Sequence, residues 1–389
     1  MITRVQVLFL SAIFFNITLG FTQNLNQAKS DIAFLTSKKC FGRGYTKSGL
    51  KNARNYLIKR IQFIGLKGLV EKKYLQTLTT DVNVFPGDVS VKIDGKNLSP
   101  GRDFIISEES KSTKGTFLLE QIDSVNWIGK SNQNTDKLYL KAENKLTWSV
   151  STDQADYTLI KFLKSYKIGQ AKSVTVDIDA SIKKGFGMDN ILAYVPGISK
   201  ADSFIVFTAH YDHLGGMGKK TFFPGANDNA SGVSMLLQLA EYYNKHPSNY
   251  SIAFMFFCGE EAGLLGSKYY STHPAFPLEK IKFLINLDLL GTGEEGVTVV
   301  NATEFPTQFN SLKKINSENN FLPLIKPRGK AANSDHYWFT ERGVPGFFIY
   351  TLGGIKAYHD IFDVAETLPL TKFDSLFKLF IQFQKALEN

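Results

Sequence analysis

Two histidines and an aspartate stand within four positions directly after an apolar run. His210, Asp212 and His213 come after the stretch "SFIVFTA", which is typical of a buried strand. Imidazole and carboxylate groups bind divalent metals and move protons. A lone histidine in such a place is usually polar filler, so the interpretation depends on the residue types at the ends of the neighbouring apolar runs.

More carboxylates and one more histidine stand at comparable places along the chain. Asp228 comes just before a predicted helix, and Asp288 ends the run "FLINLD". Glu260 and Glu261 follow the run "SIAFMFFCG", and His359 stands in "AYHDIFD". Sites in α/β sheets form beyond the carboxyl ends of the strands, where we expect these side chains to meet. Mixed imidazole and carboxylate donors suit zinc or a similar divalent metal in a site that leaves positions open for water.

The adjacent glutamates Glu260 and Glu261 are the most informative pair. Two neighbouring carboxylates repel each other and are rarely useful as structure. If one of them binds a metal and the other stays free, the free one can take a proton from metal-bound water. A hydrolase needs both a metal ligand and a free base of this kind.

The elements that must position these side chains come after Gly185. Apolar strand candidates alternate there with amphipathic helical stretches such as "ASGVSMLLQLAEYYNK" and the C-terminal "TKFDSLFKLFIQFQKALE". This alternation predicts an α/β fold, and strands that are apolar on both faces fit a sheet covered by helices on each side. We therefore expect a three-layer α/β sandwich with a mixed, largely parallel central sheet flanked by helices.

The part of the chain before Gly185 has a different pattern. Residues 48–65 predict an amphipathic helix, with Ser48 as its N-cap and Gly65 as its end. From about Phe85 to Gly185, short alternating runs such as "VSVKIDGKNL", "KLYLKAENKLTWSVS" and "SVTVDIDASI" indicate strands separated by Asp-Gly and Ser-Pro-Gly turns. This stretch predicts a small β-rich insert.

Composition and charge narrow the class of protein. The chain has 389 residues, 43% of them hydrophobic, so it can bury the core of one large domain or two smaller ones. The formal net charge is +9, but the lysines are scattered among acidic residues without a long basic run. We therefore expect no nucleic-acid partner.

The N-terminus has the layout of a secretory signal peptide. Arg4 is followed by a mostly apolar stretch from Val5 to Leu19 and then by Gly20. No later stretch is long and apolar enough to predict a membrane span. We expect an exported protein, periplasmic or extracellular, in which Cys40 and Cys258 could pair, although the apolar surroundings of Cys258 favour a small buried thiol.

Several motifs, taken together, resemble those of the di-zinc aminopeptidase family, which belongs to the co-catalytic metallopeptidases. They are "AHYDHLG", "GANDNASGVSMLLQLA", "FFCGEEAGLLGS", "NLDLLG", "SDHYWFTERGVPGFF" and "YHDIFD". The resemblance covers about Asn190 to the C-terminus, and "FGRGYTKSGLKNARNYLIKRIQFIGL" is similar to the family's N-terminal helix region. The β-rich insert stands where relatives carry a protease-associated domain.

The resemblance implies two zinc ions and a role for each motif residue. His210 and Asp288 would bind one zinc ion, Glu261 and His359 the other, and Asp228 would bridge the two.

Three further roles are implied by the same resemblance. Glu260 matches the general base. Asp212 would orient His210 from behind. Tyr358 matches a tyrosine that donates to the tetrahedral intermediate.

The remaining histidines have other expected places. His213 is expected to be a loop or substrate-side residue, and His336 with Asp335 to support the wall of the site. His246 and His273 are expected at the surface.

The function implied is an exported metallo-aminopeptidase that acts on peptides with a free N-terminus. The expected division of the chain is a signal peptide (1–20), an N-terminal part of the peptidase domain (21–84), the β-rich insert (85–185) and the rest of the peptidase domain (186–389). Glutaminyl cyclase, carboxypeptidase or dipeptidase activity on the same fold are the alternatives. A receptor-like binding protein is the alternative from another class, but it is expected to have lost metal ligands. No oligomeric state is predicted.

Overall fold

The computed structural model describes residues 23–70, 73–133, 135–166 and 168–388. The predicted signal peptide lies outside the described residues. Within the described ranges, the chain forms no helix that is long and apolar enough to cross a membrane.

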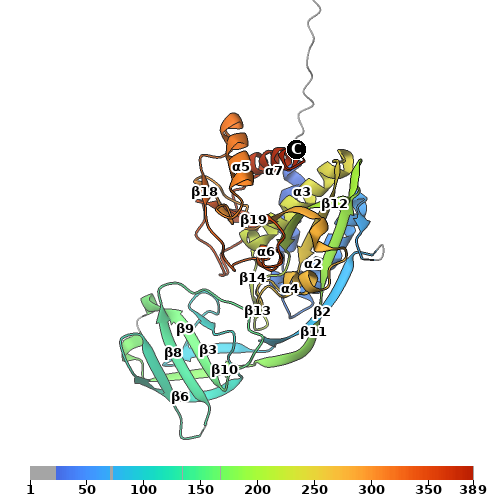
Figure 1. The fold of residues 1–389 in the computed structure, drawn as a ribbon. Helices are drawn as coiled ribbons and strands as arrows, with labels where there is room; N and C mark the ends of the chain where they lie inside the picture. The colour runs from blue at the N-terminus through green and yellow to red at the C-terminus, as the bar shows by residue number, and fades with distance from the viewer. Residues whose placement is uncertain (1–22, 71–72, 134, 167, 389) are drawn as a thin grey trace, which may run out of the picture.

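The main sheet is mixed, with its parallel strands at the centre (Figure 1). Its strand order is β1-β11-β15-β12-β16-β19-β17-β18, and β2 also pairs with β11. Parallel pairing joins β15, β12, β16 and β19, whereas β11 pairs antiparallel with β15. Strand β17 pairs antiparallel with β19 and parallel with β18. The strands are β1 (Lys67–Gly68), β2 (Leu75–Val84), β11 (Ser181–Val195), β12 (Lys200–His210), β15 (Tyr250–Phe257), β16 (Ile281–Leu287), β17 (Gly296–Val300), β18 (Ile325–Pro327) and β19 (Gly346–Leu352). The α/β class and the mixed sheet are as predicted, but parallel pairing is less extensive than the sequence suggested.

Helices pack on both faces of this sheet because its strands are apolar on both sides. Ile205 and Phe207 of β12 belong to a core shared with α1, α2, α3 and α7. Val206, which points the other way, belongs to a second core with Tyr270 of α4 and Phe339 of α6. The helices are α1 (Leu25–Leu35), α2 (Gly49–Ile64), α3 (Gly232–Lys245), α4 (Leu265–Thr272), α5 (Pro306–Asn319), α6 (His336–Thr340) and α7 (Phe373–Ala386).

Helix α2 has the bounds that its sequence predicts. Gly65 follows the helix with φ 93°, and its N–H donates to the carbonyls of Ile61 and Gln62. Glycine takes this left-handed conformation without a steric penalty, so it ends the helix cleanly. Ser48 occupies the N-cap position, but its side chain makes no capping hydrogen bond.

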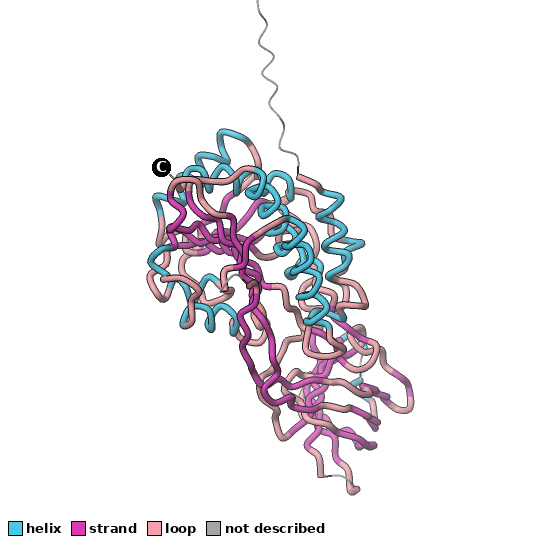
Figure 2. Tube along the Cα trace, turned by 90° about the vertical axis from the view of Figure 1, so that its right-hand side faces the viewer, coloured by secondary structure: helices cyan, strands magenta, loops and turns pink. Residues whose placement is uncertain are grey.

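A second sheet is formed by residues 89–178, and its strand order is β4-β3-β10-β6-β7-β8-β9-β5. Its strands are β3 (Val89–Ile93), β4 (Lys96–Asn97), β5 (Phe104–Ile106), β6 (Thr113–Gln121), β7 (Asn126–Lys130), β8 (Lys137–Glu143), β9 (Tyr157–Leu163) and β10 (Ser173–Ile178). Figures 1 and 2 show this sheet apart from the main sheet, with the long strands β2 and β11 running between the two.

One connection in the small sheet departs from the sequence prediction. The alternating run "KLYLKAENKLTWSVS" suggested one strand, but β8 ends at Glu143. Strands β8 and β9 are parallel neighbours, so the chain must cross from the end of β8 back to the start of β9. We call this connection, residues 144–156, the crossover.

Both cysteines are buried free thiols. The sequence left open whether Cys40 and Cys258 pair, and the structure keeps them apart. Burial raises the pKa of the Cys40 thiol to about 11 and that of Cys258 well above its usual value. Cys258 is therefore the small buried thiol that its surroundings predict.

Candidate metal centre

The structure brings the five predicted ligands together at one edge of the main sheet. His210 is the last residue of β12, Glu261 follows β15, and Asp288 follows β16. These strands are parallel neighbours, so their carboxyl ends meet. Asp228 lies in the turn that leads into α3, and His359 lies in the loop after β19.

Asp228 occupies the middle of the cluster. Its Oδ1 lies 3.3 Å from Nε2 of His210, and its Oδ2 lies 3.1 Å from Nε2 of His359. His210 Nε2 also lies 3.3 Å from Asp288 Oδ2, and His359 Nε2 lies 3.2 Å from Glu261 Oε2. The two oxygens of one carboxylate thus face two different histidines.

These distances and donors fit divalent metals. Zinc ligands about 2.0 Å from a tetrahedral ion are about 3.3 Å from one another, which is the spacing of the donor atoms here. One donor atom each of His210, Asp228 and Asp288 lies within 4.8 Å of the other two. Asp288 Oδ1 is buried and has no hydrogen-bond partner, so its lone pairs are available to a cation. Carboxylates that are buried together need a cation to offset their repulsion.

Glu260 and Glu261 have opposite electrostatic surroundings. Burial raises the pKa of Glu260 well above its usual value, against the attraction of His210, and the neighbouring charge of Glu261 raises it further. Burial and Asp228 also act to raise the pKa of Glu261, but His359 and His213 outweigh them and lower it to about 2. Glu261 is the stronger anion, and Glu260 is the better proton acceptor.

Asp212 lies beside His210, and it also holds the loop that carries both glutamates. Its carboxylate accepts hydrogen bonds from the backbone N–H groups of Glu260, at 3.2 Å, and Glu261, at 3.4 Å. Nδ1 of His210 lies 3.3 Å from the backbone oxygen of Asp212 and 3.7 Å from its Oδ1.

Tyr358 lies on the outer side of the cluster. Its side chain is 43% exposed, and its ring stacks on that of His359 with centroids 4.0 Å apart. Burial of the hydroxyl and the surrounding carboxylates, Asp228 foremost, raise the pKa of Tyr358, so the phenol stays protonated.

His213 is more closely involved than the sequence suggested. It does lie in a loop, but it is fully buried, and its Nδ1 lies 2.6 Å from Glu261 Oε1. The donor atoms of His213, Asp228 and Glu261 also lie within 4.8 Å of one another.

The other histidines lie where they were expected. His336 is buried, and burial lowers its pKa to about 3, so it is a neutral ring packed 5.2 Å from that of Phe348 in the site wall. Asp335 is buried beside it, and burial raises its pKa to about 7. His246 and His273 are exposed.

Sequence reasoning missed Arg43, which is fully buried behind the ligands. Its guanidinium donates to five backbone carbonyls, with distances of 2.7–3.3 Å. The accepting carbonyls belong to Leu35, Tyr211, Pro224, Gly225 and Asp228. Arg43 thus joins the loop after His210 to the turn that carries Asp228. An arginine between two glycines in "FGRGY" was the only local sign of a special position.

Sequence reasoning also missed two partners of the ligands. The Asp363 carboxylate accepts from the N–H groups of Asn227 and Asp228, at 2.8 and 3.0 Å. The backbone oxygen of Trp148 lies 3.0 Å from Nδ1 of His359, although Trp148 belongs to the crossover of the small sheet.

A cavity of about 410 Å³ opens in front of the cluster. Its walls include four carboxylates, aromatic side chains, one arginine and one residue of the crossover. The residues that line it are Ser149, Asp228, Glu260, Glu261, Gly263, Leu264, Asp288, Leu289, Arg328, Asn333, Phe348, Tyr350, Tyr358 and His359.

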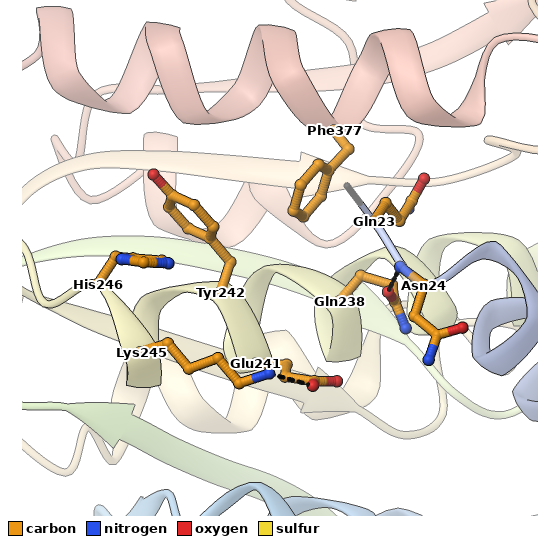
Figure 3. A pocket seen from close by; sticks show the side chains of 8 residues that line it. All are labelled: Gln23, Asn24, Gln238, Glu241, Tyr242, Lys245, His246 and Phe377. Carbon is orange, nitrogen blue, oxygen red and sulfur yellow. Dashed lines mark hydrogen bonds and ion pairs between the residues drawn. The ribbon is translucent and has the colours of Figure 1, made fainter. Parts of the chain in front are cut away.

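A second cavity, of about 450 Å³, lies away from the predicted ligands, between α3, α7 and the start of α1 (Figure 3). Its one carboxylate, Glu241, lies 2.7 Å from the amine of Lys245. The smaller cavity therefore remains the candidate site because it contains the clustered donors.

The sequence of the chain matches a family of peptidases. Residues 190–384 match the model of peptidase family M28. The chain is 34% identical over 150 residues to Aminopeptidase YwaD of Bacillus subtilis; the match covers 37% of this chain and 31% of that protein, about a third of its length.

Solved structures share the fold across nearly the whole chain. The zinc aminopeptidase BSAP of Bacillus subtilis aligns with a TM-score of 0.68 and 19% identity, covering 94% of this chain and 95% of that one. A glutaminyl cyclase of Porphyromonas gingivalis aligns with a TM-score of 0.54 and 14% identity, covering 94% and 98%. The chain thus shares its mixed α/β fold with a zinc aminopeptidase and a glutaminyl cyclase. The chain belongs to peptidase family M28.

Proposed function

We propose that the chain is a metallo-aminopeptidase that removes N-terminal residues from peptides with two zinc ions. The observation that carries this proposal is the position of Asp228, whose two carboxylate oxygens face His210 and His359. A carboxylate in this position suits a bridge between two cations. His210 and Asp288 would bind one ion, and Glu261 and His359 the other. Membership of the family and the shared fold with a zinc aminopeptidase support the choice of zinc.

The residues around the cavity suit hydrolysis of a peptide bond. When bound, the zinc ions would lower the pKa of a water molecule and polarise the scissile carbonyl. Glu260, which lines the cavity, would accept the proton of that water and pass it to the leaving amine. The Tyr358 hydroxyl would donate to the carbonyl oxygen as it becomes negatively charged.

The acidic walls of the cavity also support the proposal of a substrate with a free N-terminus. An α-amine is mostly protonated at neutral pH, and the carboxylates of Glu260 and Glu261 lie on the cavity wall. The backbone of an internal peptide segment carries no such cation.

We propose the division of the chain that the sequence predicts. Residues 21–84 and 186–389 would form a three-layer peptidase domain, and residues 85–185 a protease-associated-like insert. The separate cores and the β2–β11 connection support this division. Residues 1–20 would direct export to the periplasm or the medium and then be removed.

A screen of aminoacyl-nitroanilides with the purified protein tests the proposed activity. We expect release of nitroaniline that stops on treatment with a chelator and returns with added zinc. Elemental analysis should find two zinc ions per chain. His273→Ala, at an exposed histidine, is the matched control and should change neither result.

Other outcomes would identify the alternatives. One metal per chain, with pyroglutamate formed from an N-terminal glutamine, would indicate a glutaminyl cyclase. Hydrolysis only of peptides with a free C-terminus or only of dipeptides would indicate a carboxypeptidase or dipeptidase. Metal binding without any turnover would indicate a binding protein.

A further inference from the structure

The crossover of the small sheet contacts the candidate metal centre directly. The backbone N–H of Trp148 donates to the carbonyl of His359, with N and O 2.9 Å apart. Nδ1 of His359 lies 3.0 Å from the carbonyl oxygen of Trp148. These two reciprocal contacts hold a predicted ligand from a point 211 residues away in the chain.

The second contact determines which nitrogen of His359 faces the cluster. A carbonyl oxygen can only accept, so Nδ1 must carry the proton. Nε2 then keeps its lone pair, and it is the nitrogen that lies 3.1 Å from Asp228 and 3.2 Å from Glu261. Partners of this kind fix the ring orientation and the tautomer of a metal-binding histidine.

The side chain of Trp148 holds its backbone in place. It is 4% exposed, and its indole N–H donates to the carbonyl of Ile106 at 2.7 Å. Its ring stacks on Phe223 with centroids 4.5 Å apart. The position of the Trp148 carbonyl is therefore set by packing between the small sheet and the β13–β14 hairpin (Gly215–Met217 and Thr221–Phe223).

Lys145 of the same crossover holds the loop on both sides of His359. Its amine donates to the carbonyls of Lys356, at 3.0 Å, and Tyr358, at 3.2 Å, and lies 3.4 Å from the carboxylate of Asp360.

We infer that the crossover is part of the metal centre. Trp148 is a positioning residue that orients the ring of His359. The topology gives the reason: the parallel pairing of β8 and β9 requires a long connection, and this connection carries Trp148 to the ligand. The small sheet thereby sets the affinity of the metal position formed by Glu261 and His359. This inference rests on the proposed two-metal site, and it assigns the small sheet a part in catalysis.

Binding of cobalt(II) to metal-free protein, followed by visible absorption, tests this inference independently of activity. In Trp148→Ala we expect the affinity of one of two positions to fall about 10- to 100-fold, the usual loss for such a partner. The other position should keep its affinity. With zinc, kcat should fall at limiting metal and recover in excess metal, because mass action offsets a weakened site.

Trp127→Ala is the matched control. Trp127 is equally buried, at 4% exposed, and lies in the same core, where its ring packs against Phe162. We expect it to lower the unfolding temperature as Trp148→Ala does, with both cobalt affinities unchanged. Equal loss of cobalt affinity in the two variants would show that Trp148 acts only through stability and would overturn the inference.

Lys145→Met decides the question if Trp148→Ala does not fold. The Lys145 side chain is 48% exposed, so its loss should leave the fold intact. We expect the same position to bind cobalt about threefold or more weakly, a smaller loss than in Trp148→Ala because the side-chain packing that positions the Trp148 carbonyl remains. Unchanged affinity at both positions would overturn the inference. A wild-type chain that binds fewer than two cobalt ions would instead refute the proposed two-metal site.

Discussion

Glu260 and Glu261 are adjacent in the chain, yet their side chains have different neighbours. Glu261 lies against His213 and His359, whereas the pKa of Glu260 is raised by burial and by other carboxylates. Hydrogen bonds from both backbone N–H groups to Asp212 fix the turn between them. At the scale of single residues, a turn held at its backbone places two identical side chains in different electrostatic surroundings.

Replacement of each glutamate by glutamine separates these roles. Glu260→Gln keeps the size of the side chain but cannot accept a proton, so kcat should fall by about 10²-fold or more at unchanged metal content. Glu261→Gln should bind one metal more weakly, and excess zinc should restore part of its activity. Metal analysis beside steady-state kinetics measures both effects. Full turnover by Glu260→Gln, or loss of its metal before its turnover, would contradict the assignment.

At the scale of elements, the predicted ligands lie in loops and turns. The strand ends fix the positions of only some of these segments. The ends of β12, β15 and β16 place three of the loops, but the turn that carries Asp228 precedes α3. Arg43 ties this turn to the loop after His210 through the carbonyls of Asp228 and Tyr211. A charged donor in a fully buried place makes these bonds strong, and its loss would leave several buried carbonyls without partners.

Arg43→Met should therefore destabilise the protein and loosen the metal site together. We expect the free energy of unfolding to fall by about 3 kcal/mol or more, since each unsatisfied buried group costs about 1–3 kcal/mol. Urea unfolding in the presence of a chelator measures this loss apart from metal binding. Arg102→Met, at an exposed arginine, should change stability by less than about 0.5 kcal/mol. Equal free energies of unfolding in the two variants would show that the Arg43 hydrogen bonds do not stabilise the protein.

At the scale of the whole molecule, the candidate metal site lies where separate parts meet. The core of the small sheet includes Leu214, Met217 and Phe223 from the β13–β14 hairpin and the residue before it. The predicted ligand His359 contacts the crossover, whereas His210, Glu261 and Asp288 stand at the ends of main-sheet strands. Bound metals should therefore stabilise the contact between the two sheets as well as the site itself.

Removal of metal should lower the unfolding temperature of the whole chain. At free zinc 100-fold above its dissociation constant, each site contributes about 2.7 kcal/mol. One kcal/mol corresponds to about 2–4 °C in domains of 150–250 residues, so we expect a loss of roughly 5 °C or more. Calorimetry with and without a chelator measures the change. Asp228→Ala, which lacks the proposed bridge, should show little response to the chelator; a wild-type chain that is equally insensitive would contradict the proposal.

The sequence alone determined the α/β class, the β-rich stretch and the set of side chains that the structure brings together. These features depend on local patterns: strands and helices arise from hydrophobic periodicity, and the carboxyl ends of neighbouring parallel strands meet whatever the details of packing. His210, Glu261 and Asp288 could therefore be predicted to lie close together before any contact was known.

The tertiary structure alone decided which residues hold those side chains in place. Trp148 meets His359 across 211 positions, and Arg43 meets Asp228 across 185. The partners in such contacts cannot be read from the sequence, because they depend on where a crossover and a turn are placed when the chain packs. The burial of His213 against Glu261, and the end of β8 at Glu143, were decided in the same way. Local sequence patterns determine the helices and strands, whereas tertiary packing determines which residues contact each predicted ligand.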